Sequence, residues 1–337
     1  MKALVYTAPR QLEWQDWPNP RPGPGDAVVR VKSAAVCGSD VHGWLGHSRG
    51  RKPPLILGHE IEGEVVELDA PQSGFAPGAR VTVYPLLGCD RCAYCESGRD
   101  YLCAQRKLLG MHMPGGFAEL LQVPAKNLYA LPAEVEPAHG ALVEPLACGL
   151  HMAGLAAQER GAAVILGAGS IGLMCLLAAR QMGFAKLAVL EVNPHRSAVA
   201  LKLGAELAVS PRDPDHVQRL QDYSGADGYA AVFDAAGFTP TRQLALRLVR
   251  SAGLVVFAGL GEQETPLDCV EIVRREIRIA GSFAYNRSHF QKAVDWVASR
   301  RVDLSGWISE AKLADGQQVF EDLIDPAGTR IKVILRP

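Results

Sequence analysis

The sequence predicts an α/β protein with two domains, one rich in antiparallel β structure and one built on a doubly wound parallel sheet. Its 337 residues are enough for about two domains. In residues 1–150, short β-type runs alternate with turns rich in glycine and proline, which is typical of an antiparallel barrel or sandwich. From about residue 160, strand-like and helix-like runs alternate, which predicts βαβ crossovers and a parallel sheet.

In the β-rich part, the predicted strands are apolar runs separated by turn signals such as NPRPGPGD and APGAR. They are KALVY (2–6), DAVVRVKSAAV (26–36), EIEGEVVEL (60–68), ARVTVYPLL (79–87) and FAELLQV (117–123).

The second part begins with a predicted strand, AAVILG (162–167), which a predicted helix, SIGLMCLLAARQMG (170–183), follows directly. The alternation continues to IRIAGS (277–282) and gives about six strands. An amphipathic helix, HFQKAVDWVASR (289–300), then leads back to short β segments that end in IKVILRP (331–337).

Charge and hydropathy narrow the classes of partner. The 35 basic and 36 acidic residues give a net charge of −1, so neither nucleic acid nor an anionic membrane is expected as a partner. The N-terminus lacks the apolar core and cleavage pattern of a secretory signal. No apolar run approaches the ~18 residues that indicate a membrane span. We therefore expect a cytoplasmic protein, where thiols stay reduced.

Four of the eight cysteines fall within residues 89–103, in the pattern C-x2-C-x2-C-x7-C. A disulfide framework is disfavoured in the cytoplasm, and a redox motif needs a single C-x-x-C. Thiolates at such short spacings suit a closed structural zinc site. Iron–sulfur ligation also uses closely spaced thiolates and stays open at this point. The candidate ligands are Cys89, Cys92, Cys95 and Cys103.

A glycine-rich loop joins the first predicted strand of the second part to its helix. Gly167, Gly169 and Gly172 form G-x-G-x-x-G, with Ile171 inside the motif. Such a loop lets the backbone approach a pyrophosphate, which then binds at the helix N-terminus. Glu191 follows the next strand, nineteen residues after Gly172. Because a carboxylate there accepts hydrogen bonds from ribose hydroxyls and repels a 2′-phosphate, NAD is expected rather than NADP.

A second group of metal-type residues is spread over three motifs. Cys37 lies in AAVCGSDVHGW, His59 and Glu60 lie in LGHEIEGEVVE, and Glu144 lies in VEPLACG. Each alone is readily interpreted as a core or surface residue. Together they offer a thiolate, an imidazole and carboxylates, which suit an open, catalytic zinc site.

These motifs, taken in order, resemble the zinc-dependent medium-chain dehydrogenases, on the side of the sorbitol and other polyol dehydrogenases. The resemblance spans nearly the whole chain and rests on CGSDVHGW, LGHEIEGEVVE, GCDRCAYC, GGFAEL, EPLACGLH, GAGSIGLM and IKVILRP. It implies a GroES-like β-barrel catalytic domain (1–150 and 286–337) around a Rossmann NAD-binding domain (151–285). It also implies an active site in the cleft between them, two zinc ions per chain, and a homodimer or homotetramer joined through the Rossmann domains.

The resemblance also assigns roles to single residues. Cys37, His59 and Glu60 match the ligands of the catalytic zinc, and Glu144 matches a glutamate that polyol dehydrogenases have near the metal. Asp40 resembles a residue that orients the zinc-binding histidine. Two more residues, Ser39 and His42, match a proton relay. Arg196 resembles a residue near the adenosine, and Cys148 matches no ligand position and is interpreted as packing.

The expected reaction is the reversible oxidation of a secondary alcohol to a ketone. Zinc makes a substrate hydroxyl more acidic, Ser39 takes the proton, and His42 passes it to solvent. The expected substrate is a sugar alcohol. A loop at residues 46–54 holds Arg49, Arg51 and Lys52, which is interpreted either as a solvated surface loop or as a site for a substrate phosphate.

Three alternatives stay open. Two are other substrates of the same chemistry, namely an amino alcohol or diol such as threonine or butanediol, and a simple alcohol. The third is a sensor that binds zinc and NAD without turnover.

Overall fold

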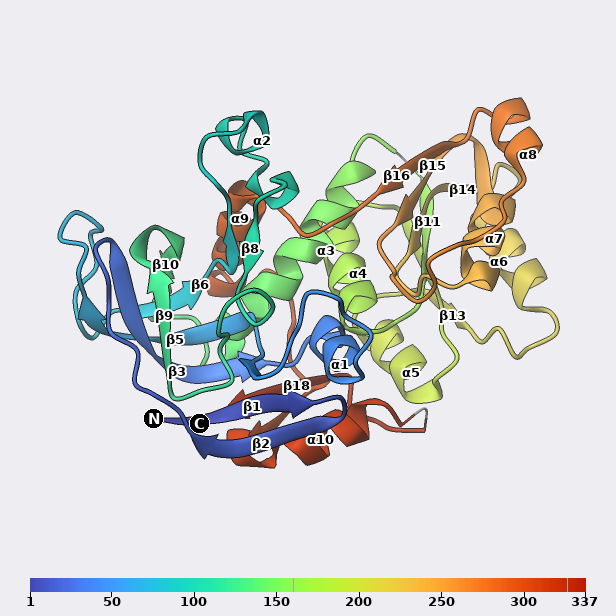
Figure 1. Ribbon diagram of the computed structural model, residues 1–337. Helices are drawn as coiled ribbons and strands as arrows, with labels where there is room; N and C mark the ends of the chain where they lie inside the picture. Colours follow the sequence, from blue (N-terminus) through green and yellow to red (C-terminus); the bar gives the residue numbers. More distant parts are fainter. Residues whose placement is uncertain (160, 326) are drawn as a thin grey trace. The chain divides into compact units, whose positions relative to one another are not determined.

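The computed structural model describes residues 1–159, 161–325 and 327–337. Over these residues the chain divides into two compact units. The first comprises Met1–Glu144 and Asn286–Pro337, and the second comprises Pro145–Tyr285. The first unit is therefore built from both ends of the chain, and Figure 1 shows the blue and red segments side by side in it. The predicted boundary at residue 150 lies inside helix α3 (Val143–Leu155), six residues beyond the end of the first segment.

The first unit consists mainly of strands. These are β1 (Lys2–Ala8), β2 (Gln11–Asp16), β3 (Asp26–Ala35), β4 (Leu55–Ile56), β5 (Glu60–Leu68), β6 (Arg80–Val83), β7 (Leu86–Leu87), β8 (Lys107–Leu108), β9 (Leu120–Pro124), β10 (Leu128–Ala130), β17 (Ile308–Lys312) and β18 (Lys332–Arg336). Its helices are α1 (Gly38–Trp44), α2 (Ala93–Glu96), α9 (Arg287–Ala298) and α10 (Gly316–Leu323), with the short 3-10 helices η1 (Asp100–Leu102), η2 (Ala125–Asn127), η3 (His139–Leu142) and η4 (Leu313–Asp315).

The main sheet of this unit runs in the order β10-β6-β5-β3-β18-β17, and β9 also pairs with β3. Strand β3 is antiparallel to both β5 and β18. At its last residue, Ala35 lies opposite Glu60 of β5 and opposite Ile334 of β18. This register brings the end of β3, the start of β5 and the start of β18 to the same place. The side chains that follow or begin these strands therefore meet there.

The second unit alternates strands and helices. Its strands are β11 (Ala162–Leu166), β12 (Lys186–Leu190), β13 (Leu207–Val209), β14 (Tyr229–Asp234), β15 (Val249–Phe257) and β16 (Arg278–Gly281). Besides most of α3, its helices are α4 (Ser170–Gln181), α5 (Pro194–Lys202), α6 (His216–Ser224), α7 (Thr239–Leu248) and α8 (Cys269–Arg274).

All the strand pairs of this unit are parallel, in the order β13-β12-β11-β14-β15-β16. Within the described residues the sheet has six strands, so the predicted parallel sheet is confirmed. Every residue of β11 and of β14 is buried, which is why both strands are apolar throughout except for Asp234 at the end of β14. Nowhere in the part of the chain that the structure describes is a helix long and apolar enough to cross a membrane.

Candidate metal centres and dinucleotide-binding loop

The first candidate centre lies where β3, β5 and β18 meet. Cys37 follows β3 and caps the N-terminus of α1, while His59 and Glu60 stand at the start of β5. One ligand atom from each of these three residues can be chosen so that all of them lie within 4.8 Å of one another. A thiolate, an imidazole and a carboxylate at such distances are the donor set of a zinc site. These three side chains, at most 23 residues apart in the sequence, are thus gathered by strand pairing.

Burial and charge at this centre favour a cation. Glu60 is fully buried, and its Oε1 atom has no hydrogen-bond partner among the described residues. Burial raises the pKa of Glu60 well above its usual value, and the nearby Cys37 and Glu144 add to this effect while Lys332 opposes it. Burial also raises the pKa of the Cys37 thiol, but His59 and Lys332 lower it further, to about 7. The residues present therefore fit a zinc ion, which would offset the crowded negative charge.

Lys332 is a member of this centre that the sequence analysis missed. It begins β18, is fully buried, forms an ion pair with Glu60, and donates a hydrogen bond of 3.0 Å to the Val36 carbonyl. Its neighbours Glu60 and Cys37 raise the pKa of Lys332 although burial lowers it. A lysine between apolar residues of a strand, as in IKVIL, was the available signal.

Asp40 links the centre to helix α1. Its Oδ1 atom lies 3.3 Å from His59 Nδ1, and its Oδ2 atom accepts a hydrogen bond of 3.2 Å from the Cys37 backbone N–H. Burial raises the pKa of Asp40, but His59 and then Arg51 lower it further, to about 2. The carboxylate is therefore ionised and able to fix the ring of His59 through Nδ1, which leaves Nε2 for a metal.

Glu144 stands apart from the three donors. It is buried in the first turn of α3, and its charge acts on Glu60. Among the described residues, the group that meets the 4.8 Å condition consists of Cys37, His59 and Glu60 without Glu144.

The two residues of the expected relay both lie on α1. Ser39 is half-buried and accepts a hydrogen bond of 3.1 Å from Arg51 Nη2. His42 is exposed, and its ring lies 5.0 Å from that of His47 between centroids. Burial, and then the charges of His47 and Arg51, lower the pKa of His42. Across the described residues, no hydrogen bond joins Ser39 directly to His42.

The basic residues of the loop at residues 46–54 differ in their exposure to solvent. Arg49 and Lys52 are exposed, but Arg51 is 6% exposed and ion-paired with Asp40 at 3.1 Å. The expectation of a solvated loop is therefore wrong for Arg51. Its partners are distributed over α1 and the segment around Gly110, which no local sequence pattern reveals.

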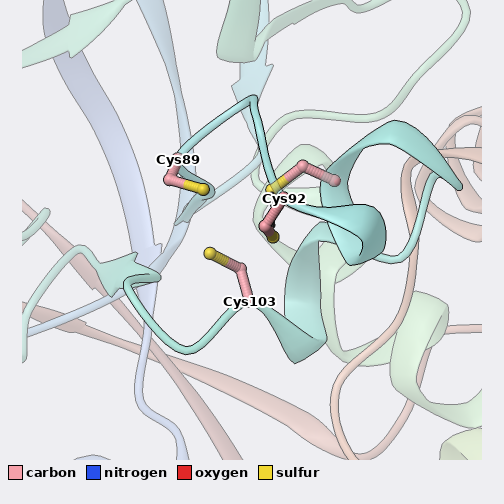
Figure 2. A group of neighbouring side chains, drawn as sticks. Cys89, Cys92 and Cys103 are labelled. Carbon is pink, nitrogen blue, oxygen red and sulfur yellow. Dashed lines mark hydrogen bonds between the residues drawn. The ribbon is translucent and has the colours of Figure 1, made fainter.

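The cysteine lobe, residues 88–103, forms the second candidate centre. The sulfur atoms of Cys89, Cys92, Cys95 and Cys103 all lie within 4.8 Å of one another. Figure 2 shows the side chains of Cys89, Cys92 and Cys103 turned toward one common space. Cys92 and Cys95 lie at the two ends of the first turn of α2, with their sulfur atoms 3.6 Å apart. Four thiols around one point fit a closed tetrahedral zinc site.

The glycine-rich loop lies at the carboxyl edge of the parallel sheet, directly after β11. Gly167 has a φ of +98°, and a Cβ atom at Gly172 would lie 1.9 Å from the Gly167 carbonyl oxygen. Both positions therefore require glycine. Gly169 caps the N-terminus of α4 and has open space where its Cβ would be. That open space beside a helix N-terminus fits a pyrophosphate. Ile171 lies half-buried in the first turn of α4.

Glu191 lies beside this loop because Leu166 and Leu190, the last residues of β11 and β12, are paired. The carboxylate is 5% exposed and accepts hydrogen bonds from Ala168 N at 2.6 Å and from Asn193 N at 2.9 Å. Arg196 lies on α5, and its Nε atom is buried without a hydrogen-bond partner among the described residues. The carboxylate thus ties the glycine-rich loop to the start of α5.

Comparison with known proteins gives matches over both units. The family model described as "Alcohol dehydrogenase GroES-like domain" matches residues 23–133, and the one described as "Zinc-binding dehydrogenase" matches residues 170–299. An L-galactonate-5-dehydrogenase of Escherichia coli K12 is 33% identical over 90% of this chain and 88% of its own length. An L-threonine 3-dehydrogenase of a Chelativorans species is 30% identical over 94% of this chain and 93% of its own.

Solved structures are similar over the full length. A zinc-binding dehydrogenase of Sinorhizobium meliloti 1021, bound to NADP, has a TM-score of 0.93 and 33% identity, covering 100% of this chain and 99% of that one. A dehydrogenase of E. coli CFT073 in complex with NADH has a TM-score of 0.92 and 25% identity, with coverage of 100% and 99%. A galactitol-1-phosphate dehydrogenase of E. coli has a TM-score of 0.89 and 26% identity, with coverage of 100% of both chains.

Proposed function

The chain belongs to the family of zinc-binding alcohol dehydrogenases with a GroES-like domain, and from this premise we propose that it oxidises a secondary hydroxyl group of a sugar alcohol to a ketone with NAD. The observation that carries the proposal is the donor set formed by half-buried Cys37 with buried His59 and Glu60. Its carboxylate resembles the pattern of polyol dehydrogenases. Zinc-dependent oxidation or reduction with a nicotinamide cofactor is the activity of the family itself.

In the proposed reaction, the substrate carbon gives a hydride to the nicotinamide and its hydroxyl gives up a proton, so that a C=O bond replaces C–H and O–H. When bound, zinc polarises the substrate oxygen and the nicotinamide accepts the hydride. Cys37, His59 and Glu60 would hold the metal, and Asp40 would fix the ring of His59. Lys332 balances part of the negative charge of Glu60 and Cys37.

The proton leaves through helix α1. Ser39 lies two residues after Cys37. Its hydroxyl group can accept the proton of the substrate hydroxyl while it donates its own proton to the next group. His42, one turn further on the same helix and exposed, delivers the proton to solvent. Because its pKa is lowered by burial and by neighbouring cations, His42 is neutral near pH 7 and able to take a proton.

NAD is the proposed cofactor because the carboxylate of Glu191 is buried beside the glycine-rich loop, where it would repel a 2′-phosphate. The orphaned Arg196 Nε is the opposing feature, since a cation there would attract that phosphate. Similar structures are bound to NADP in one case and to NADH in another.

A second candidate substrate is an anionic polyhydroxylated molecule, either a sugar acid or a sugar-alcohol phosphate. Two observations favour it. One similar protein is named for L-galactonate and one for galactitol 1-phosphate. Arg49 and Lys52 are exposed in the loop that follows the relay helix, whereas the buried Arg51 is already paired.

The test is a comparison of kcat/KM over hexitols, pentitols, aldonates, galactitol 1-phosphate, threonine, 2,3-butanediol and monohydric alcohols, each with NAD and with NADP. We expect a polyhydroxylated substrate and NAD to give the highest values, because a pocket that hydrogen-bonds hydroxyl groups rejects molecules lacking them. His59→Ala is the control that should abolish turnover with the fold intact. A monohydric alcohol that surpasses every polyol would contradict the substrate class, and a higher value with NADP would contradict the cofactor.

A further inference from the structure

Arg51 is a buried cation that the proposed reaction does not yet use. It lies in the loop between α1 and β4 and is 6% exposed. Its side chain crosses Gly43 of α1 so closely that a Cβ atom there would lie 2.2 Å from Arg51 Cδ. Glycine inside a helix costs about 1 kcal/mol relative to alanine. Helix α1 therefore contains a destabilising residue at the place where Arg51 passes into the interior.

The guanidinium group of Arg51 contacts three residues in two segments, helix α1 and the segment around Gly110. Its Nε donates to the Gly110 carbonyl at 3.1 Å. Its Nη2 donates to Ser39 Oγ at 3.1 Å and to Asp40 Oδ1 at 3.1 Å. One nitrogen atom thus bridges the hydroxyl group of the relay and the carboxylate that faces His59.

The bridge constrains what both partners can do. A guanidinium has only donors and keeps its charge, so Ser39 must accept from it. The Ser39 hydroxyl then has one lone pair and its own proton left, which are what a residue needs to accept one proton and release another. The same contact stops Asp40 from turning away from His59, because Asp40 Oδ1 is shared between Arg51 and His59 Nδ1.

We propose that Arg51 is a positioning residue that holds Ser39 and Asp40 in one hydrogen-bonded unit, so that the proton-accepting hydroxyl and the ring of His59 are oriented together. The inference rests on the proposed function, since it gives the relay its geometry. Among the described residues, no hydrogen bond or ion pair joins Arg51 to Cys37, His59 or Glu60, so Arg51 acts through its two partners.

A purely structural ion pair is the explanation to be excluded, and the same unit supplies a matched control. Arg80 donates to Glu62 Oε1 from Nε at 2.8 Å and also to the carbonyls of Val135 and Glu136. Glu62 is 3% exposed, so this is also an arginine held by a buried carboxylate and by backbone carbonyls. It contacts neither Ser39 nor Asp40.

The experiment compares Arg51→Met, Arg51→Lys and Arg80→Met with the wild-type holoenzyme. For Arg51→Met we expect kcat to fall by about 10- to 100-fold and the KM of the alcohol to change by less than about threefold. The solvent deuterium isotope effect on kcat should rise, because proton transfer becomes slower. Arg51→Lys should recover part of kcat through one of the lost contacts. Arg80→Met should lower the melting temperature and leave kcat and the isotope effect unchanged.

A double-mutant cycle with Ser39→Ala tests the route of the effect. If Arg51 acts through Ser39, Arg51→Met costs less in the Ser39→Ala background than in the wild type. Equal costs together with an unchanged isotope effect would overturn the proposal, as would a kcat within about twofold of wild type. Should Arg51→Met fail to fold, Arg51→Lys carries the same test, since it retains the charge.

The rate at which a chelator removes zinc tests the role of Arg51 independently of the proposed function, because it can be measured without turnover. With His59 less well oriented, Arg51→Met should release one of the two zinc ions about 10- to 100-fold faster than wild type does. Release at the rate seen for Arg80→Met would overturn the role of Arg51. A wild-type protein that oxidises no alcohol would contradict the proposed function alone, and the chelator measurement would still judge Arg51.

Discussion

Asp40, Glu60 and Lys332 each carry an ionisable group into a fully buried position. An isolated charge there would cost several kcal/mol, so each needs a partner. Asp40 has Arg51 and His59, and Glu60 has Lys332. The negative charge of Cys37 and Glu60 is then opposed by Lys332 and by the metal. At the scale of single residues, the candidate zinc centre is a set of paired charges that includes Arg51 and Lys332 besides the donors.

The pH dependence of alcohol oxidation should report on His42. Protonated His42 cannot accept the relay proton, so activity falls as pH drops through its pKa. Burial and the charge of His47 lower the pKa of His42, so we expect the acid limb of kcat below about pH 6.5. His47→Gln removes one of the cations and should shift that limb to higher pH, which a kcat profile between pH 5 and 9 would measure. A limb that stays in place, or moves to lower pH, would exclude His42 as the titrating group.

The sequence pointed to the candidate donors but not to the residues that orient them and balance their charge. Cys37, His59 and Glu60 stand in short motifs whose spacing is visible in one dimension. Arg51 and Lys332 act through contacts 59 and 296 residues away in the sequence, with Gly110 and with Val36. Their burial depends on tertiary packing, which overrides the general expectation that charged residues are exposed.

Among the elements, the cysteine lobe is fixed to the rest of its unit through Asp100. Tyr84 donates a hydrogen bond of 2.8 Å to Asp100 Oδ1, and Arg287 Nε lies 3.4 Å from Asp100 Oδ2. The guanidinium of Arg287 also lies over the Tyr84 ring, 4.4 Å from its centroid. Asp100 lies between Cys95 and Cys103, so metal binding in the lobe also fixes the position of Asp100. Through its two contacts, Asp100 then stabilises Tyr84, which follows β6, and Arg287, which begins α9.

Two zinc ions per chain are predicted, with different consequences of removal. Cys92→Ser should lower the melting temperature by about 5 °C or more, because a structural zinc contributes folding energy. The kcat of the remaining folded protein should change less than in His59→Ala. Elemental analysis and calorimetry of both variants would measure these effects. One zinc ion or none in carefully purified wild-type protein would show the two-centre interpretation to be wrong.

Elements with a clear period were predictable, and those without one were missed. The strands β11, β12, β14 and β15 contain continuous apolar runs and were predicted. Helix α3 was not predicted, because VEPLACGLHMAGL is apolar on nearly all sides and is mostly buried, so it lacks an amphipathic pattern. Strand β2, QLEWQD, was also missed, because it is short and partly exposed and therefore gives only a weak sequence signal.

On the scale of the whole molecule, strand β16 ends the parallel sheet with an unpaired edge among the described residues. Exposed apolar side chains gather in and near it: Val270 and Val273 on α8, Ile279 on β16, and Phe283 after it. An exposed edge with apolar neighbours favours pairing with another chain. The expected partner is a second copy of this chain, in line with the homodimer or homotetramer that the family resemblance implies.

We predict a dimer or tetramer in solution, with β16 at its interface. Light scattering coupled to size exclusion should give at least twice the 36.2 kDa of one chain. Val273→Asp introduces a charge at a residue that is 76% exposed, so it should shift the protein toward the monomer. The melting temperature of the monomer itself should not fall. Wild-type protein that runs as a monomer at all concentrations would contradict the prediction.

The division of the first unit between both ends of the chain has a consequence for biosynthesis. A ribosome completes Val36 and Cys37 long before Lys332, which lies 296 residues beyond Val36. Until β18 emerges, the central strand β3 lacks a neighbour and Glu60 lacks its counter-charge. The cysteine lobe, with its four thiols in one short segment, can take up zinc while translation continues. We therefore expect the cysteine lobe to be complete well before the first candidate centre, which needs the last strand of the chain.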